Sequence, residues 1–345
     1  MLGSCDEPLS VAHDVAMLDL DGVVYVGDEG VPGAAAAIQA ARDAGQRIVF
    51  ITNNASRTPD KVAAKIVRTG VPAEVEEVVT SAQAAARVLH ARHGDGARVV
   101  TLGAVGLVSA LEVAGLTPVA VDDEDAVALV TGYGPDVVWR DVMRAAVRIR
   151  DGLPWVASNT DHTIPTEFGV APGHGVMVAM LREFSGVDPV VAGKPQRPLL
   201  DETVERTGAE RPLMVGDRLD TDIEGAVALG MPALLVMTGV TQLAELVTAG
   251  PDLRPTYISA DLGGLVVAHA APEHAGGSSA GWRSGGWTAS VDGGRLRVSG
   301  SGDASDWWRS VAVAAWEHLD RTGDAVDAGG VRPPEGATGT GSLQA

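Results

Sequence analysis

Two carboxylates close together in the sequence have the spacing of a cation site. Asp19 and Asp21 flank one apolar residue directly after the apolar run 15–18, and Gly22 follows them. Carboxylates that converge where a strand ends repel one another unless a cation lies between them. Oxygen ligands of this kind suit Mg²⁺. Taken alone, this motif is also compatible with a polar turn at the end of a strand that binds no cation.

A second acidic motif follows another apolar run. Asp217 comes directly after residues 212–216, and Asp222 lies about one helical turn further on. Asp217 is therefore placed to join the first two carboxylates, and Asp222 to support the same cation. Capping of a helix N-terminus would explain one aspartate here, but it does not require three between 217 and 222.

Two further motifs have the residue types that bind an anion. Thr52 and Asn53 end the apolar run 47–51, where a hydroxyl and backbone N–H groups can bind phosphate. Lys194 stands between glycine and proline in a chain with only three lysines, so it reads as a fixed positive charge. An ordinary loop and a surface turn are the alternatives for these two motifs.

The elements that must position these residues alternate between short β-branched runs and Ala-rich helical stretches. This alternation predicts an α/β fold with a mainly parallel sheet. All four motifs fall at or near the carboxyl ends of predicted strands, the edge at which open α/β sheets bind ligands. The stretch between Thr52-Asn53 and Lys194 has enough strands and helices for an inserted α/β domain.

The C-terminal region has a different composition. Residues 271–286 are rich in Gly, Ser and Ala and predict a linker. Alternating residues on either side of Asp292-Gly293-Gly294 predict a hairpin, and 304–321 predict an amphipathic helix. The expected segments are a core in two parts (1–81 and 189–270), an insertion (82–188), the linker (271–286), a small α+β extension (287–325) and a disordered end (326–345).

Composition limits the function classes. The chain has 345 residues and a net charge of −19, which argues against nucleic-acid and membrane-surface binding. The single cysteine, Cys5, excludes an intramolecular disulfide and a Cys-rich zinc site. No apolar run approaches membrane-spanning length and residues 1–14 lack a signal peptide's features, so we expect a cytoplasmic protein. The sequence leaves the oligomeric state open, a homo-oligomer included.

The order of the motifs resembles the haloacid dehalogenase (HAD) superfamily of phosphotransferases. With h for an apolar residue and x for any residue, the motifs are hhhhDxDGV, hhhhTNN, GKP and hhhhGDxxxTD. The TNN form and the position of the insertion resemble its C2-capped 4-nitrophenylphosphatase/NagD-like branch. The resemblance implies a Rossmann-like parallel-sheet core with an inserted C2-type α/β cap. The core with a C-terminal extension resembles actinobacterial glycerol 3-phosphate phosphatases, whose tail is acetyltransferase-like. This tail lacks an acyl-CoA pyrophosphate loop, so we expect no acetyl transfer.

The resemblance also implies roles for residues. Asp19 would be the nucleophile and Asp21 the acid/base. Mg²⁺ would be bound by Asp19, the Asp21 carbonyl and Asp217, with Asp222 in support. The other implied contacts are Thr52, Asn53, Gly22 and Lys194 for phosphate, and Asn159, Asp161, His162 and His174 in the cap for substrate.

The expected reaction is hydrolysis of a small phosphomonoester, glycerol 3-phosphate first, through an aspartyl-phosphate. A broad-specificity phosphatase for pyridoxal phosphate, phosphoglycolate, a nucleotide or 4-nitrophenyl phosphate is the alternative. A phospho-accepting signalling domain also clusters Asp, Thr and Lys, but it has no cap. A non-catalytic binding protein would not need both Asp19 and Asp21.

Overall fold

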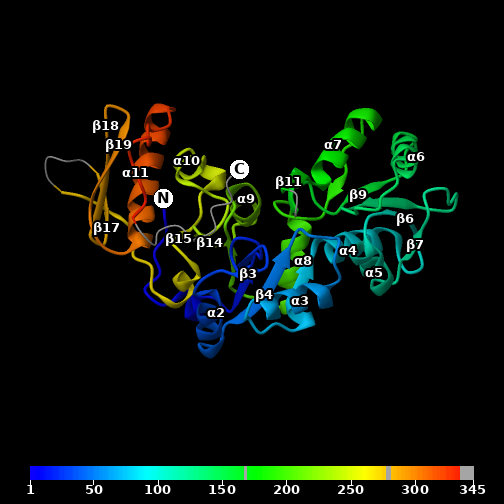
Figure 1. The fold of residues 1–345 in the computed structure, drawn as a ribbon, viewed down its shortest axis with the longest axis horizontal. Helices are drawn as coiled ribbons and strands as arrows, with labels where there is room; N and C mark the ends of the chain where they lie inside the picture. The colour runs from blue at the N-terminus through cyan, green and yellow to red at the C-terminus, as the bar shows by residue number, and fades with distance from the viewer. Residues whose placement is uncertain (167–168, 277–280, 335–345) are drawn as a thin grey trace. The chain divides into compact units, whose positions relative to one another are not determined.

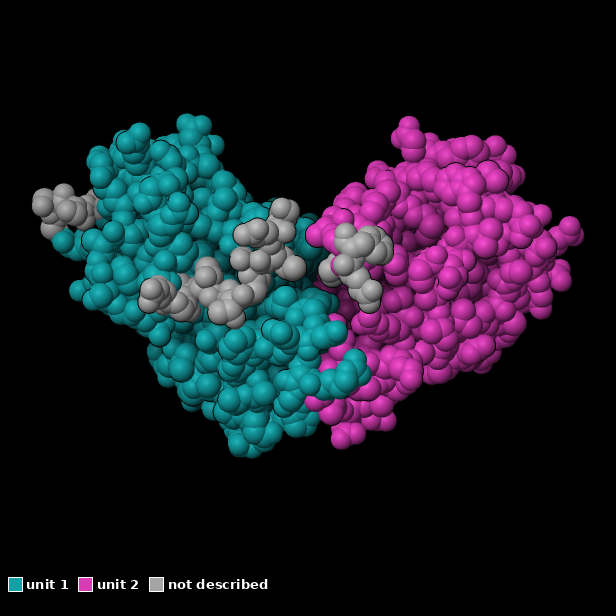
Figure 2. All heavy atoms as spheres, viewed as in Figure 1, with its two compact units in different colours: residues 1–49, 68–72, 209–344 teal, residues 50–67, 73–208, 345 magenta. Residues whose placement is uncertain are grey.

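The computed structural model describes residues 1–166, 169–276 and 281–334. It has two compact units, drawn in teal and magenta in Figure 2. Unit 1 comprises residues 1–49, 68–72 and 209–344, and unit 2 comprises residues 50–67, 73–208 and 345. Unit 2 is therefore larger than the predicted insertion 82–188, and the predicted borders of the core and of the insertion stay a prediction.

Unit 1 is built on four adjacent parallel strands in the order β15–β14–β13–β1. Strands β1 and β14 are buried along their whole length, as expected for parallel strands covered on both faces. Its elements up to β15 are α1 (Leu9–Ala12), β1 (Val15–Leu18), β2 (Tyr25–Val26), β3 (Glu29–Gly30), α2 (Ala34–Asp43), β13 (Pro212–Gly216), the π-helix η2 (Leu219–Ile223), α9 (Glu224–Ala228), β14 (Ala233–Val236), α10 (Leu243–Val247), η3 (Pro251–Leu253) and β15 (Tyr257–Ser259).

Unit 2 contains a five-stranded parallel sheet of its own, in the order β12–β9–β8–β6–β7; β9, β6 and β7 are labelled in Figure 1. Helices α6 and α7 pack with this sheet around a core that includes Leu129, Ile149 and Trp155. Strand β4 (Arg47–Thr52) starts in unit 1 and ends in unit 2, and α3 (Pro59–Arg68) starts in unit 2 and has its last residue in unit 1. The other elements are η1 (Val75–Glu77), β5 (Val78–Thr80), α4 (Ser81–His93), β6 (Arg98–Leu102), α5 (Val105–Val113), β7 (Thr117–Val119), β8 (Ala128–Thr131), α6 (Trp139–Arg150), β9 (Trp155–Ala157), β10 (Thr163–Thr166), β11 (Gly169–Pro172), α7 (His174–Ser185), β12 (Val190–Val191) and α8 (Arg197–Thr207).

The C-terminal region is an antiparallel sheet with one long helix, and it belongs to unit 1 (Figure 1). Strands run in the order β16–β17–β18–β19, and β18 pairs with β19 around the predicted turn. Asp303 caps the helix by accepting a hydrogen bond from the Ser305 N–H. The elements are η4 (Leu262–Val266), β16 (Glu273–His274), β17 (Trp282–Ser284), β18 (Trp287–Asp292), β19 (Arg295–Gly300) and α11 (Ala304–Thr322).

Two sequence predictions for this region are wrong in part. The predicted linker 271–286 contains strands β16 and β17, because the Trp282 strand pairs on both sides. The predicted disorder does not begin at 326: Val326 is buried, and Asp327 exchanges backbone hydrogen bonds with Gly294 and Leu296. Residues 335–345 lie outside the described residues.

Helix α11 docks on strand β15 and helix α10 through aromatic and charged side chains. Trp307, Trp308 and Trp316 are buried, and the Trp316 indole N–H donates to the Leu246 carbonyl at 2.8 Å. Arg254 forms two hydrogen bonds with Asp320 of the helix. The tail therefore packs against the rest of unit 1 through helix α11.

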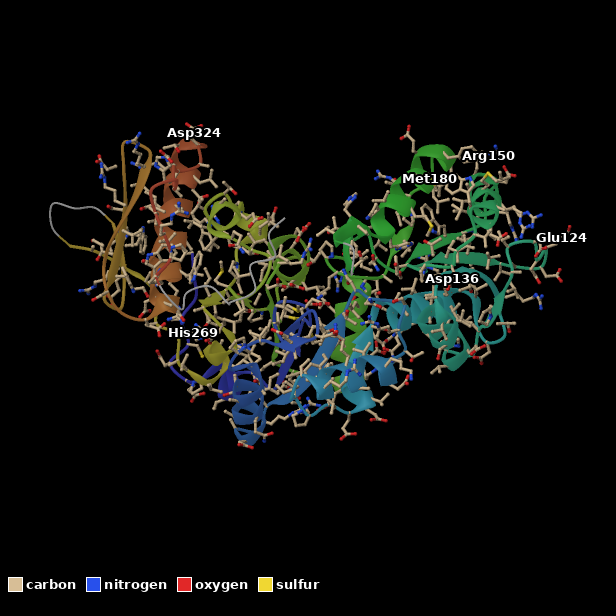
Figure 3. All side chains as sticks on the ribbon, in the orientation of Figure 1. Glu124, Asp136, Arg150, Met180, His269 and Asp324 are labelled. Atoms are coloured by element: carbon tan, nitrogen blue, oxygen red, sulfur yellow. The ribbon has the colours of Figure 1, made fainter. Side chains whose placement is uncertain are left out.

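A buried histidine ties α11 to the segment that precedes the tail. His269 (labelled in Figure 3) has one ring nitrogen, Nε2, 2.8 Å from the Gly264 carbonyl, so Nε2 carries the proton. Its other nitrogen, Nδ1, accepts a hydrogen bond from the Arg309 guanidinium at 3.0 Å. Burial, with a smaller contribution from the Arg309 charge, lowers the pKa of His269 to about 4. The folded protein therefore holds this histidine neutral.

This geometry predicts acid sensitivity of the fold. Above pH 6.5 His269 is neutral in the folded and unfolded states alike. Between pH 6.5 and about 4 only the unfolded state takes up the proton, so the free energy of unfolding falls as pH falls, by about 3 kcal/mol over the window. Thermal unfolding of His269→Gln should show a shallower loss of melting temperature from pH 7 to 4.5 than wild type. The exposed-histidine control His162→Gln should keep the wild-type slope; equal slopes for all three proteins would contradict the prediction.

Candidate active site

The acidic motifs meet at one edge of unit 1 because their strands are neighbours. Strands β1 and β13 pair in parallel, with Leu18 opposite Val215. The Asp19 N–H continues this ladder by donating to the Val215 carbonyl at 2.9 Å. The carboxyl ends of both strands thus deliver Asp19 and Asp217 to the same edge, the position at which open α/β sheets bind ligands.

Asp19, Asp217 and Asp222 form a carboxylate cluster. One oxygen from each lies within 4.8 Å of the others. Asp217 and Asp222 are fully buried, and Asp19 is partly buried. Burial, followed by the negative charges of Asp222 and Asp19, raises the pKa of Asp217 well above its usual value. Unless a positive charge enters, this arrangement disfavours full ionisation of the three groups.

Asp222 is held in place by the π-helix η2. The Asp222 and Ile223 N–H groups both donate to the Arg218 carbonyl at 3.2 Å, and the Arg218 N–H donates to the Asp222 carboxylate at 3.1 Å. The backbone of Gly216 lies so close to Asp222 that an added Cβ would overlap this side chain. Asp222 can therefore lie beneath the end of β13 only because residue 216 is glycine.

The cluster fits a divalent cation of the Mg²⁺ type. Asp217 Oδ2 accepts a hydrogen bond from the Val240 N–H at 2.6 Å. Asp217 Oδ1 is buried and has no hydrogen-bond partner among the described residues, which is the arrangement expected of an oxygen reserved for a metal. Asp19 and Asp217 are the residues that would hold the ion with their carboxylates, as hard oxygen ligands.

Asp21 and Gly22 form the turn that follows Asp19. The Asp21 side chain is exposed, which suits a group that must reach a substrate, and it is not part of the carboxylate cluster. Gly22 has φ +83°, in the left-handed region, and its N–H donates to the Tyr25 carbonyl at 2.8 Å. A side chain at position 22 would both be strained and overlap Asp217.

Of the predicted phosphate contacts, Thr52, Asn53 and Lys194 belong to unit 2, and Gly22 belongs to unit 1. Asn53 accepts a hydrogen bond from the Lys194 N–H at 2.8 Å and donates one to the Lys194 carbonyl at 2.9 Å. Lys194 is only 2% exposed. The Thr52 hydroxyl oxygen accepts from the Asn54 N–H at 3.1 Å, and Thr52 itself is buried. Asn53 thus fixes the backbone of Lys194, which lies 141 positions away in the sequence.

The predicted cap residues divide into two groups. Asn159 donates to the Asn53 carbonyl at 2.7 Å, and Asp161 accepts from the Asn53 amide at 3.0 Å, so both join the Lys194 group. His174 contacts this group only through Asn159: its Nδ1 lies 2.8 Å from the Asn159 carbonyl. His174 is also one of the residues that line a cavity of about 360 Å³ in unit 2. His162 is exposed, and its carbonyl accepts from the Gly173 N–H.

Sequence reasoning missed the loop after strand β14. The Thr238 hydroxyl donates to the Gly22 carbonyl at 2.5 Å, and the N–H groups of Val240 and Thr241 donate to Asp217. The available signal was a Thr-Gly pair directly after an apolar run, the same pattern of a polar residue at a strand end that drew attention to Thr52.

Comparison with known families decides the classification. Residues 16–117 match a model described as haloacid dehalogenase-like hydrolase, and residues 191–265 match a second model of HAD-like hydrolases. The chain is 42% identical to the D-glycerol 3-phosphate phosphatase of Mycobacterium tuberculosis, over 88% of this chain and 86% of that protein. This chain belongs to the haloacid dehalogenase-like hydrolases. Family membership and the α/β fold class predicted from sequence are thereby confirmed.

Further relatives and solved structures to which the chain is similar are phosphatases as well. An acid sugar phosphatase of Staphylococcus saprophyticus is 35% identical, over 71% of this chain and 94% of the relative. Among solved structures, glycerol phosphate phosphatase from M. tuberculosis with magnesium superposes with a TM-score of 0.81 and 42% identity, over 90% of this chain and 92% of that one. The 4-nitrophenylphosphatase of Thermotoga maritima superposes with a TM-score of 0.69 and 28% identity, over 75% of this chain and 98% of that one.

The tail of this HAD-like hydrolase has a match of its own. Residues 284–333 match a model described as GCN5-related N-acetyltransferase like.

Among the described residues, no helix has the length and apolar character needed to cross a bilayer.

Proposed function

We propose that this HAD-like hydrolase is a Mg²⁺-dependent phosphatase that hydrolyses glycerol 3-phosphate. The observation that carries the substrate is the extent of the match. The M. tuberculosis D-glycerol 3-phosphate phosphatase is similar over 88% of this chain. The acid sugar phosphatase and the 5′-nucleotidase of Bacillus subtilis are similar over 71% and 66% of it, although most of their own length is covered. The similarity thus continues beyond the part that phosphatases of other substrates share.

The chemistry follows from the residues around Asp19. We assign Asp19 as the nucleophile: its carboxylate oxygen forms a bond to phosphorus as the bond between phosphorus and the leaving alkoxide breaks. Asp21 gives its proton to that alkoxide, and the resulting carboxylate takes a proton from the water that hydrolyses the aspartyl-phosphate. Asp19, the Asp21 carbonyl and Asp217, with Asp222 in support, would hold the cation, which would supply positive charge for polarising the phosphoryl group.

The remaining roles concern phosphate and substrate. We assign binding of the phosphoryl oxygens to Thr52, Lys194 and the backbone N–H groups near Gly22 and Asn53. Lys194 is buried in a chain of net charge −19, and local charge outweighs distant surface charge because salt screens beyond about 8–10 Å. Asn159 and Asp161, which contact Asn53, are the cap residues that we assign to the substrate, ahead of His162 and His174.

A panel of phosphomonoesters tests the proposal. With Mg²⁺, the two glycerol 3-phosphate enantiomers, pyridoxal phosphate, phosphoglycolate, AMP and 4-nitrophenyl phosphate are compared by kcat/KM. We expect one glycerol 3-phosphate enantiomer to rank first. A higher value for another compound would support the broad-specificity alternative, and no hydrolysis at all would overturn the proposal.

The rate of hydrolysis should depend on which divalent cation is present. EDTA should abolish turnover and Mg²⁺ restore it, whereas excess Ca²⁺ should inhibit. Ca²⁺ takes more ligands at longer distances, so it would draw the second Asp19 oxygen away from attack. Phosphate release in Mg²⁺ with increasing Ca²⁺ is the measurement; equal rates with the two ions would contradict this account of Asp19.

A further inference from the structure

The loop from Met237 to Thr241 links the two acidic motifs of unit 1. It follows strand β14, and Thr238 within it is 5% exposed. The Thr238 hydroxyl donates to the Gly22 carbonyl at 2.5 Å, although the two residues are 216 positions apart. This bond reaches the turn that carries Asp19 and Asp21.

The same loop also holds Asp217. The Val240 N–H donates to Asp217 Oδ2 at 2.6 Å, and the Thr241 N–H donates to the Asp217 carbonyl at 3.1 Å. Added Cβ atoms at Gly22 and at Gly239 would both overlap the Asp217 carboxylate. The Asp217 carboxylate thus lies against the backbones of both glycines, and the Thr238 hydrogen bond joins those two backbone segments.

We propose that Thr238 is a positioning residue, which sets the place of Asp217 relative to the Asp19–Gly22 turn and so the geometry of the cation site. Without the hydroxyl, the buried Gly22 carbonyl loses its donor, and a buried acceptor without a partner favours displacement of the backbone. Either glycine segment can then move away from Asp217. The inference rests on the proposed function only in taking the cluster to bind Mg²⁺.

Three variants separate positioning from general stability. Thr238→Val keeps the shape and removes the hydroxyl, and Thr238→Ser keeps the hydroxyl. Thr256→Val is the matched control: the Thr256 hydroxyl accepts a hydrogen bond from the Ala233 N–H at 3.1 Å, at the opposite end of the same strand β14. Each purified full-length protein is titrated with Mg²⁺ by calorimetry in the absence of substrate, and its melting temperature, kcat and KM are measured.

We expect Thr238→Val to weaken Mg²⁺ binding by about 10- to 100-fold, the range seen when groups behind metal ligands are lost. Its kcat should fall more than its KM changes. The Mg²⁺ affinity of Thr238→Ser should stay within about threefold of the wild-type value, because the serine hydroxyl can still donate to the Gly22 carbonyl. Thr256→Val should lower the melting temperature without changing Mg²⁺ affinity.

Two results would overturn the role of Thr238: wild-type Mg²⁺ affinity in Thr238→Val, or an equal loss in Thr256→Val. Failure of wild type to bind Mg²⁺ would overturn it as well. If Thr238→Val weakens Mg²⁺ binding but the wild-type chain hydrolyses no phosphomonoester, the positioning role stands and the proposed function fails.

Discussion

Asp19→Asn should reduce turnover of glycerol 3-phosphate by on the order of 10⁴-fold or more, because the amide neither attacks phosphorus nor matches the carboxylate as a cation ligand. Asparagine has nearly the same size, and Asp19 is only partly buried, so the fold should persist. Phosphate release under single-turnover conditions is the measurement, with the melting temperature checked alongside.

The matched control for this variant is Asp28→Asn, an exposed aspartate in the turn between β2 and β3. It should retain the wild-type rate. Mass spectrometry must show that the Asp19→Asn preparation contains no deamidated protein. Normal turnover by such a preparation would exclude a covalent intermediate at Asp19.

Asp21→Asn should slow hydrolysis of glycerol 3-phosphate by about 10²- to 10⁴-fold, the usual contribution of a positioned acid or base. The first step with 4-nitrophenyl phosphate should suffer much less, since 4-nitrophenolate leaves without a proton. Burst kinetics with this substrate should show fast release of 4-nitrophenolate and slow release of phosphate. An equal loss in both steps, for both substrates, would argue that Asp21 acts by a route other than proton transfer.

Much of the site could be predicted because its residues follow local patterns. Buried runs such as 15–18 and 212–216 are short and apolar, and parallel strands bring their carboxyl ends to one edge. The position of Asp19 next to Asp217 therefore required only that the two strands be neighbours. The roles assigned to these residues remain predictions until the variants are measured.

The features that sequence reasoning missed depend on contacts between distant segments. Nothing near Thr238 in the sequence indicates that its hydroxyl meets Gly22. Strand β16 consists of two exposed polar residues, Glu273 and His274, and it exists only through its pairing with β17. Composition describes such a segment as a linker because its partner strand is invisible to a local pattern.

The docking of α11 on β15 has a consequence for the behaviour of the chain in concentrated solution. β15 is the last strand on its side of the unit 1 sheet, and an open strand edge is a template for pairing with another molecule. Here the Arg309 guanidinium donates a hydrogen bond to the Ile258 carbonyl at 2.9 Å, and the Ala260 N–H donates one to the Ser305 hydroxyl oxygen at 3.1 Å. The acetyltransferase-like tail thus makes this edge unavailable for intermolecular β-sheet growth, a protective task that needs no catalysis of its own.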